Sequence, residues 1–342
     1  MTFLVSRESS CDFSATSRIW SGDELSLLAK EVMIRTKTQP QEIITSGCNI
    51  CGSRIGHLVA NRLRFNVRRN VVKCGGCGLV YQSPLMSEEE EKELYSKEYR
   101  NVPDVPGHYL PQAADAFFRV ELRPNAERLT RVEKYLAPSS RCLEIGCAAG
   151  SFLYLLKKKC SESAGIELDE AFSSFARNEL GLTVFDRPIQ ELGFPPSSFD
   201  AIFIWHVLEH LRDPSGSLKV LLEILKRGGY LFLELPNVDD ALLTLYKLGS
   251  YSSFYYQPAH SYYFSRKTMT RILEEAGFRY RIRMLQRYSI LNHLSWIIRG
   301  KAQAKPAFKT HFPLSVVDQV YRTVLCALDR ADTLFVIAQR PF

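Results

Sequence analysis

Residues 142–156, CLEIGCAAGSFLYLL, decide the fold. The stretch reads as a short apolar strand, a tight turn and the start of a helix. Gly146 and Gly150 lie four positions apart in the turn, where glycine lets the backbone approach a ligand closely. The N–H groups at the start of the next helix can bind that ligand. The spacing is E-x-G-x-(G/A)-x-G, with Ala148 in the middle, and it differs from the dinucleotide pattern G-x-G-x-x-G.

Around this stretch, short apolar runs alternate with helical segments. We expect helices at 150–159, 170–180, 214–226 and 268–276, and strands at 141–145, 163–167, 183–185, 200–205, 230–235, 280–285 and 334–339. This alternation indicates βαβ units and a doubly wound, parallel α/β sheet. A helical insertion is expected at 289–330.

The helix expected at 214–226 has clear end signals. Asp213 is a suitable N-cap and Pro214 suits the first helical position. Lys226 and Arg227 favour the last turn, and residues 228–229, both glycine, are expected to stop the helix.

Glu167 is expected at the end of the second strand of this sheet, one βαβ step after Glu144. A carboxylate there can accept hydrogen bonds from both hydroxyls of a ribose. The alternative is that Glu167 only caps the next helix. The glycine-bearing turn favours the ribose role.

Four segments in order carry a family resemblance: LEIGCAAGSFL (143–153), GIELDEAFSSFARNELG (165–181), SFDAIFIWHVLEHLRDP (198–214) and LKRGGYLFLELPN (225–237). They resemble the motifs of class I S-adenosylmethionine-dependent methyltransferases. The resemblance implies a seven-stranded, Rossmann-like sheet with the cofactor over the carboxyl ends of its first four strands.

The resemblance also implies which residues bind the cofactor. The methionine and ribose side would be lined by Glu144, Gly146, Cys147, Ala148 and Gly150. Glu167 would hold the ribose and Leu168 would pack on the adenine. Where the family often has an acidic residue near the adenine amino group, this chain has Pro188 and Ile189, so Asp186 or Gln190 is a substitute.

Residues 205–211, WHVLEHL, contain His206-x-x-Glu209-His210, the H-x-x-E-H spacing of one class of zinc peptidase. A peptidase needs both histidines on a regular helix and a third ligand downstream. Here the pattern directly follows an apolar strand, so we place it on the strand-to-helix connection, where open α/β sheets bind ligands.

We expect His206 to touch the methionine end of the cofactor and His210 to face the substrate as general base, because histidine titrates near neutral pH. Two alternatives stay open. Glu209 and His210 could only buttress the loop. They could also hold a divalent ion with another residue, which looks similar to some quinone O-methyltransferases.

Cys48, Cys51, Cys74 and Cys77 form two C-x-x-C pairs separated by 22 residues. Two such pairs can place four thiolates tetrahedrally around Zn²⁺. Disulfides are the alternative, but no signal peptide is evident, so we expect the cytoplasm, where thiols stay reduced. Four sulfur ligands leave no open position, so the zinc would be structural. His57 is nearby but not required.

The chain is therefore expected to divide into a lead-in at 1–46, a zinc ribbon at 47–86, a helical linker or cover at 87–139, and the methyltransferase domain at 140–342. In the ribbon, short strands are expected at 58–59, 65–67, 71–73 and 79–81. The lead-in contains one helix at 24–34. Ser87 should cap an acidic helix, and a second helix at 113–138 should bend at Pro124.

A zinc ribbon before this core is similar to sugar C-methyltransferases that act on nucleotide-linked 4-keto-deoxysugars, in which a pair matching Glu209 and His210 is catalytic. This chain departs from that set in two ways. Val207 stands where a tyrosine is expected, and we do not expect the large C-terminal domain of that set in this chain. We expect a small, sugar-like or otherwise oxygenated acceptor. The aromatic-rich stretch 251–265, which includes His260, would cover it or only pack over the sheet.

The remaining observations limit the kinds of partner that we expect. The net charge is +7 without a long basic run, so nucleic-acid binding is not expected. No apolar run is long enough for a membrane span. The amphipathic segments 290–301 and 314–330 favour a homodimer face or closure of the core over membrane contact. The rival functions are a non-enzymatic scaffold or reader with a vestigial cofactor fold, and a nicotinamide-dependent oxidoreductase.

Overall fold

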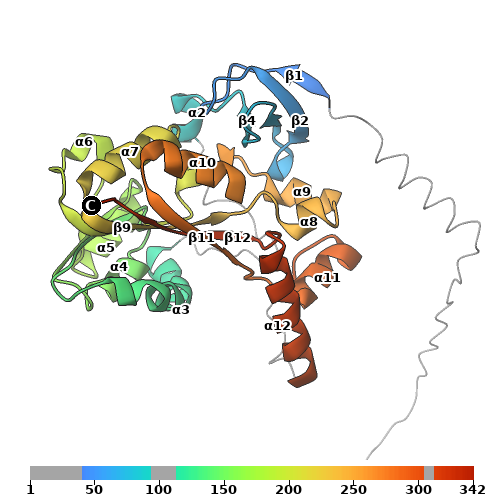
Figure 1. The fold of residues 1–342 in the computed structure, drawn as a ribbon. Coiled ribbons are helices and arrows are strands. Elements are labelled where there is room, and N and C mark those ends of the chain that lie inside the picture. The colour runs from blue at the N-terminus through green and yellow to red at the C-terminus, as the bar shows by residue number, and fades with distance from the viewer. Residues whose placement is uncertain (1–40, 94–112, 304–311) are drawn as a thin grey trace, which may run out of the picture. The chain divides into compact units, whose positions relative to one another are not determined.

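The computed structural model describes residues 41–93, 113–303 and 312–342, and the helix expected at 24–34 lies outside these ranges. All elements below belong to the unit Glu42–Phe342 (Figure 1). No helix in the described ranges combines the length and apolar character that crossing a membrane requires.

A seven-stranded sheet forms the centre of the fold, in the order β11-β12-β9-β8-β5-β6-β7. Its strands are β5 (Arg141–Ile145), β6 (Glu162–Ile166), β7 (Thr183–Phe185), β8 (Phe199–Trp205), β9 (Leu225–Pro236), β11 (Arg279–Leu285) and β12 (Thr333–Gln339). Strands β5 to β9 are mutually parallel, and β12 is antiparallel to both of its neighbours. The predicted α/β, Rossmann-like sheet is confirmed.

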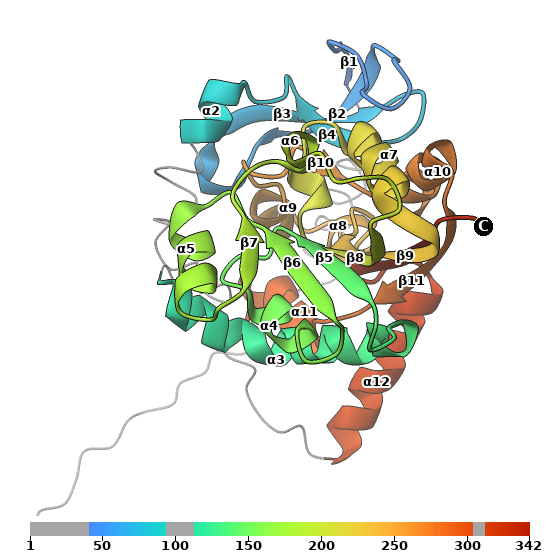
Figure 2. The same cartoon turned by 90° about the vertical axis from the view of Figure 1, so that its left-hand side faces the viewer.

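Helices cover both faces of this sheet, as Figures 1 and 2 show. One face carries α3 (Ala114–Val132), α4 (Ser151–Leu156) and α5 (Glu170–Asn178), and the other carries α6 (Ile189–Leu192), α7 (Pro214–Ile224) and α10 (Arg266–Ala276). Residues along β8 alternate between the two hydrophobic cores. Phe203 and Trp205 join the α3–α4 core, while Ile202 and Ile204 join the α7–α10 core. Burial on both faces explains why this strand is continuously apolar.

Helix α7 begins as expected but ends early. The Asp213 carboxylate accepts a hydrogen bond of 2.8 Å from the Gly216 amide. The prediction that Lys226 and Arg227 close the helix is wrong, because β9 starts at Leu225, which pairs with Phe199 of β8. Sheet pairing therefore overrides the basic and glycine stop signals.

The cysteine-rich segment forms a second, five-stranded sheet in the order β1-β2-β3-β4-β10. Its strands are β1 (Glu42–Ile44), β2 (Ile55–Arg62), β3 (Arg68–Cys74), β4 (Val80–Ser83) and β10 (Tyr262–Tyr263). The strand expected at 65–67 is wrong. A turn with the 3-10 segment η1 (Arg64–Asn66) stands there, because Phe65 and Asn66 adopt φ values of 63° and 62°.

Further helices connect and cover the two sheets. They are α2 (Glu88–Glu93), α8 (Ala241–Thr244), α9 (Gly249–Tyr255), α11 (Ile290–Arg299) and α12 (Phe312–Ala327). The hydroxyl of Ser87 caps α2 by accepting from the Glu90 amide at 3.2 Å, as expected. Helix α3 continues through Pro124 as one element. The last two helices form the predicted insertion between β11 and β12.

Candidate functional site

The chain order of the central sheet reverses between β5 and β8. From β5 the chain builds β6 and β7 on one side, and it then returns to build β8 and β9 on the other. Loops that leave β5 and β8 therefore diverge, and open α/β sheets bind ligands in the resulting crevice at the carboxyl ends of the strands. The glycine-bearing turn follows β5 and the H-x-x-E-H segment follows β8, so the fold brings the two predicted motifs together.

Both glycines of the turn are required by its geometry. Gly146 has a φ of +71°, and a Cβ there would lie 2.4 Å from Cγ2 of Val207. Gly150 has a φ of +80° at the start of α4, and its Cβ would lie 2.7 Å from Cδ1 of Leu182. A side chain at either position would push the turn away from the β8 loop or from the sheet, so the close approach of the backbone depends on glycine.

The Glu167 carboxylate ties the turn to the next strand. Its Oε2 accepts a hydrogen bond from the Ala148 amide and its Oε1 accepts one from the Asp169 amide, each at 2.9 Å. Asp169, and not Glu167, is the N-cap of α5. Capping of α5 therefore does not explain why the Glu167 side chain lies at the crevice beside Ala148. Cys147 faces the other way, because its side chain is buried in the α3–α4 core.

Two buried polar atoms at the ends of β5 and β8 have no hydrogen-bond partner among the described residues. They are Oε2 of Glu144 and Nε1 of Trp205. Burial raises the pKa of Glu144 to about 8, against the lowering effect of Arg128. Buried polar groups are normally paired. The two unpaired atoms and the glycine-bearing turn therefore suit a cofactor with charged and polar groups. The amino acid part of S-adenosylmethionine carries such groups.

The residues expected near the adenine lie further along this rim. Leu168 is 61% exposed, so its side chain is accessible to a ligand. Ile189 is partly buried at the start of α6. The two proposed substitutes already have partners. Asp186 forms an ion pair with Arg177 at 3.4 Å, and Nε2 of Gln190 donates to the Ser217 hydroxyl at 3.5 Å.

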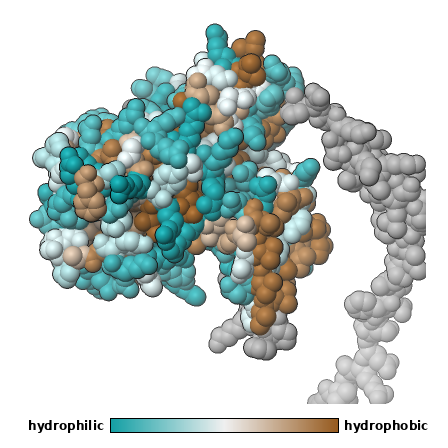
Figure 3. Space-filling view, viewed as in Figure 1, coloured by the Kyte–Doolittle hydropathy of each residue, from teal (hydrophilic) through white to brown (hydrophobic). Residues whose placement is uncertain are grey.

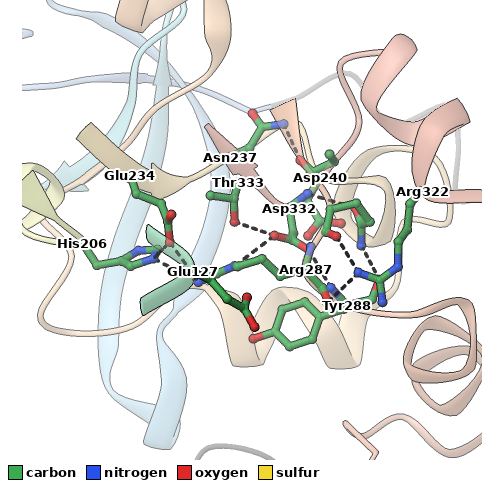
Figure 4. Close-up of polar contacts among 12 residues, drawn as sticks. Glu127, His206, Glu234, Asn237, Asp240, Arg287, Tyr288, Arg322, Asp332 and Thr333 are labelled. Atoms are coloured by element: carbon green, nitrogen blue, oxygen red, sulfur yellow. Dashed lines mark hydrogen bonds and ion pairs between the residues drawn. The ribbon is translucent and has the colours of Figure 1, made fainter. Parts of the chain in front are cut away.

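His206 lies in a buried polar network that Figure 4 shows. The residue has a φ of +56°, and its amide donates to the Glu234 carbonyl at 2.7 Å. Its Nε2 is 3.2 Å from Oε1 of Glu234 and 2.9 Å from Nη1 of Arg287. Nη2 of Arg128 also reaches Oε1 of Glu234 at 2.9 Å, while Arg287 bonds Asp332. The network fixes the imidazole beside the crevice.

Glu209, His210 and His260 form a second cluster, and the segment 208–210 is a single 3-10 turn as expected. Their possible ligand atoms lie within 4.8 Å of one another. The rings of His210 and His260 meet edge to face, with centroids 4.7 Å apart. Burial lowers the pKa of His210, and it lowers that of His260 to about 3. Both imidazoles are thus neutral near pH 7, the form in which histidine accepts a proton.

The Glu209 carboxylate lies between these histidines. Burial acts to raise the pKa of Glu209, and the positive charges that His206, His210 and His260 carry when protonated act to lower it to about 2. Nδ1 of His206 lies 3.6 Å from Oε1 of Glu209. Neither carboxylate oxygen has a hydrogen-bond partner in the described residues. The side chain is 1% exposed, so the carboxylate faces the cluster and not bulk solvent.

Sequence reasoning missed several members of the site. Glu234, Arg128, Arg287 and Asp332 were not singled out, although they hold His206. One signal was present: Glu234 is the only charged residue in the apolar run 230–235 and stands near the carboxyl end of its strand. His260 was noted only as part of the aromatic stretch, and its contact with His210 bridges 50 residues of sequence.

The four ribbon cysteines come together as predicted. The Sγ atoms of Cys48 and Cys77 are 3.6 Å apart, and those of Cys51 and Cys74 are 3.4 Å apart. All four are free thiols, so the disulfide alternative is wrong. Four sulfurs around zinc, each about 2.3 Å from the metal, would be about 3.8 Å apart. The donor set and its spacing fit a structural Zn²⁺, and no open coordination position is left.

Comparison with known proteins identifies the central part of the chain. The family model described as "Methyltransferase domain" matches residues 117–281. This span includes the glycine-bearing turn, Glu167 and the H-x-x-E-H segment. Residues 117–281 are therefore similar to methyltransferase domains. The prediction of an S-adenosylmethionine-dependent methyltransferase is confirmed for this domain, and the zinc-peptidase and nicotinamide readings are not supported.

Individual relatives of the methyltransferase domain are distant. A ubiquinone biosynthesis O-methyltransferase of Xylella fastidiosa is 31% identical over 134 residues, which cover 37% of this chain and 54% of that protein. An uncharacterized protein of Methanocaldococcus jannaschii is 28% identical over 142 residues, 42% of this chain and 66% of its own length. The chain thus spans about half to two thirds of these curated relatives.

Among solved structures, one similar chain is a SAM-dependent methyltransferase from Archaeoglobus fulgidus. It is 25% identical, with a TM-score of 0.48, over 65% of this chain and 96% of that chain.

Proposed function

We propose that this chain transfers a methyl group from S-adenosylmethionine to a small oxygenated acceptor. The observation that carries the proposal is the shared rim of β5, β6 and β8, where the turn, the Glu167 carboxylate and the His210 cluster converge. The cofactor, when bound, supplies an electrophilic methyl group on a sulfonium. Glu144, Gly146, Ala148, Gly150 and the backbone of Cys147, whose side chain is buried in the α3–α4 core, would line its amino acid and ribose parts, with Glu167, Leu168, Ile189 and His206 around them.

The chain's own contribution is position and proton transfer. A pre-ordered site can supply roughly 7–11 kcal/mol by holding the reacting groups together. His210 is neutral, faces the Glu209 carboxylate and is oriented by a hydrogen bond to the Ala259 backbone. It would take the proton from an acceptor hydroxyl or acidic C–H as the methyl group arrives, and Glu209 would stabilise the imidazolium that forms.

The acceptor belongs to one of two classes. The zinc ribbon and the Glu209–His210 pair support a nucleotide-linked or polysaccharide sugar. The relatives named as ubiquinone biosynthesis O-methyltransferases support a hydroxylated aromatic ring. The aromatic side chains around His260, including Tyr255 and Tyr263, are buried in a core cluster, so they support the position of His260 and do not distinguish the two acceptor classes.

Two measurements test the proposal. Calorimetry with S-adenosylmethionine should show binding that Glu167→Ala weakens. Transfer of radiolabelled methyl groups to a panel of nucleotide-linked keto sugars and dihydroxy aromatic compounds should then identify the acceptor class. Absence of cofactor binding to the folded chain would overturn the proposal and favour the non-enzymatic scaffold.

A second role for the His210 cluster follows from its donor set. Glu209, His210 and His260 offer a carboxylate and two imidazoles within 4.8 Å, which a divalent transition-metal ion would accept. In this role His210 would be a ligand and not a base. Loss of turnover on chelation, with restoration by a divalent ion, supports the metal role. Unchanged turnover in a metal-free sample supports the base.

We also propose the organisation around the catalytic part. Cys48, Cys51, Cys74 and Cys77 would hold a structural Zn²⁺ in a ribbon at 47–86. The lead-in at 1–46, the linker at 87–139 and the methyltransferase domain at 140–342 complete the division, except that β1 (Glu42–Ile44) at the end of the lead-in pairs with β2 and so belongs to the ribbon sheet. Metal analysis of the purified chain should give about one zinc per chain.

A further inference from the structure

The outer face of α12 carries no charged side chain. Between residues 314 and 328 the exposed positions are Val316, Val317, Gln319, Val320, Thr323, Val324, Ala327 and Leu328. Charged residues make up 24% of the whole chain, so this face is unusual. Valine also has a lower helix propensity than alanine or leucine, so the exposed valines do not stabilise the helix by propensity. The composition of the outer face therefore indicates a surface that another molecule buries.

The charged residues of α12 point inward instead. Oδ1 of Asp318 accepts from the Ile290 amide at 2.7 Å. Nη1 of Arg322 donates to the Gln286 and Arg287 carbonyls at 2.8 and 3.0 Å. These polar contacts, together with Leu325 in the core and Tyr321 packed against it, hold the helix to the domain, and both charged side chains are turned away from the outer face.

Helix α11 extends the same surface. Its inner residues Asn292, His293 and Trp296 are buried, while Leu294, Ile297 and Ile298 are 41%, 43% and 76% exposed. Nδ1 of His293 and the Tyr321 hydroxyl lie 2.7 Å apart, which ties α11 to α12. Figure 3 shows apolar side chains covering both helices. We call this surface the α11–α12 face: Leu294, Ile297, Ile298, Val316, Val317, Val320, Val324 and Leu328. Contiguous exposed apolar surface of this kind marks an interaction site.

We propose that the α11–α12 face packs against the same face of a second copy of this chain. Val317, Val320, Val324 and Ala327 are spaced three, four and three residues apart, which is the a/d spacing of helices that pack side by side. In a twofold dimer each surface meets itself, so a charge would meet a like charge. A surface without charges avoids that repulsion.

The size of the face fits a dimer. A helix of the length of α12 spans about 24 Å, and two adjacent helices are about 20 Å wide. The face thus offers on the order of 500 Å² per copy, and the pair about 1,000 Å², the lower limit for a specific interface. A helix that lies on a membrane instead presents its basic side chains along the polar face. In α12 the polar face instead contacts the rest of the domain through Asp318 and Arg322.

Sedimentation velocity of the full chain tests the dimer. The 39.1 kDa chain should sediment as a dimer at micromolar concentration. Val320→Glu and Val324→Glu, which place like charges in the interface, should weaken dimerisation by about 100-fold or more. Gln319→Glu adds the same charge outside the a/d stripe and should leave the dimer intact. All three positions are exposed, so unchanged near-UV circular dichroism should confirm folding.

Three results would overturn the proposal. One is a monomer at 100 μM under the conditions of the assay. Another is a dimer that the valine variants weaken no more than Gln319→Glu does. The third is a monomeric chain that co-sediments with vesicles of phosphatidylcholine and phosphatidylglycerol and loses that binding in Val320→Glu, because the face would then meet lipid.

Discussion

Nη1 of Arg287 lies 2.9 Å from Nε2 of His206, although 81 residues separate the two in sequence. Oε1 of Glu234 lies 3.2 Å from the same Nε2, and Nδ1 of the ring lies 3.6 Å from Oε1 of Glu209, so one guanidinium and two carboxylates surround the imidazole. The contact fixes the ring that we expect at the methionine end of the cofactor.

Replacing Arg287 by Ala should therefore weaken cofactor binding by about 10-fold, since His206 and the Asp332 carboxylate both lose a partner. Calorimetry measures the change. Arg283→Ala, which replaces an exposed arginine on the strand β11 that precedes Arg287, is the matched control and should bind normally. Equal affinities of the two variants would show that Arg287 does not position His206.

Replacing Glu167 by Ala should raise the dissociation constant for S-adenosylmethionine by about 10- to 100-fold, because hydrogen bonds to a charged group are lost. The carboxylate also holds the Ala148 and Asp169 amides, so the turn itself should loosen. Glu162→Ala removes an exposed carboxylate at the other end of β6 and serves as control. Unchanged affinity in Glu167→Ala would contradict the ribose assignment.

Replacing His210 by Ala should lower turnover by about 10²- to 10⁴-fold, the range expected for a lost general base. Cofactor affinity should change little, because the residue faces the acceptor. Added imidazole should restore part of the turnover. If turnover survives the substitution, His210 is a buttress of the loop and not the base.

Stability should fall as pH rises through the titration of Glu144. Burial raises its folded pKa to about 8 from the ordinary 4.5. The folded chain therefore holds this proton more tightly than the unfolded chain. The stabilising contribution is fully present below pH 4.5 and is lost as pH rises through 8, at up to about 1.4 kcal/mol per pH unit.

Chemical denaturation at several pH values, without cofactor, measures this slope. Glu144→Gln should flatten it between pH 5 and 8, and the difference between the two proteins cancels the titration of groups that both retain, such as Asp240. Parallel pH profiles would show that Glu144 is ionised in the folded chain.

Replacing Cys74 by Ser should remove the metal and destabilise the ribbon, because a structural zinc supplies folding free energy. Metal analysis and thermal unfolding check this. Cys160→Ser, a thiol outside the cluster, is the control. Full zinc content in Cys74→Ser would exclude four-cysteine ligation.

Local sequence signals located most of the central sheet. The strands at 141–145 and 183–185 have the expected bounds, since apolar runs between helical segments mark buried parallel strands. The errors have tertiary causes. Leu225 leaves the helix because Phe199 offers a sheet partner. The run at 65–67 turns because Phe65 and Asn66 adopt left-handed conformations.

The site was predictable only where its residues are close in sequence. The turn, Glu167 and the 206–210 segment stand in recognisable patterns. The network around His206 includes residues of α3, β9 and the loop after β11: His206 contacts Glu234 and Arg287 directly, and Arg128 joins through Glu234. These contacts cross 28 to 106 residues. No single-sequence periodicity reports such pairings. They depend on the strand order, which brings the carboxyl ends of β8, β9 and β11 to one rim.

The fifth strand of the ribbon sheet comes from the segment that resembles a methyltransferase domain. Tyr262 and Tyr263 of β10 pair with Tyr81 and Val80 of β4, and both tyrosines are almost wholly buried. A deletion that removes the ribbon would expose these rings and an open strand edge. The ribbon is therefore not a separable domain. Moving it to another enzyme would require moving residues 258–264 with it.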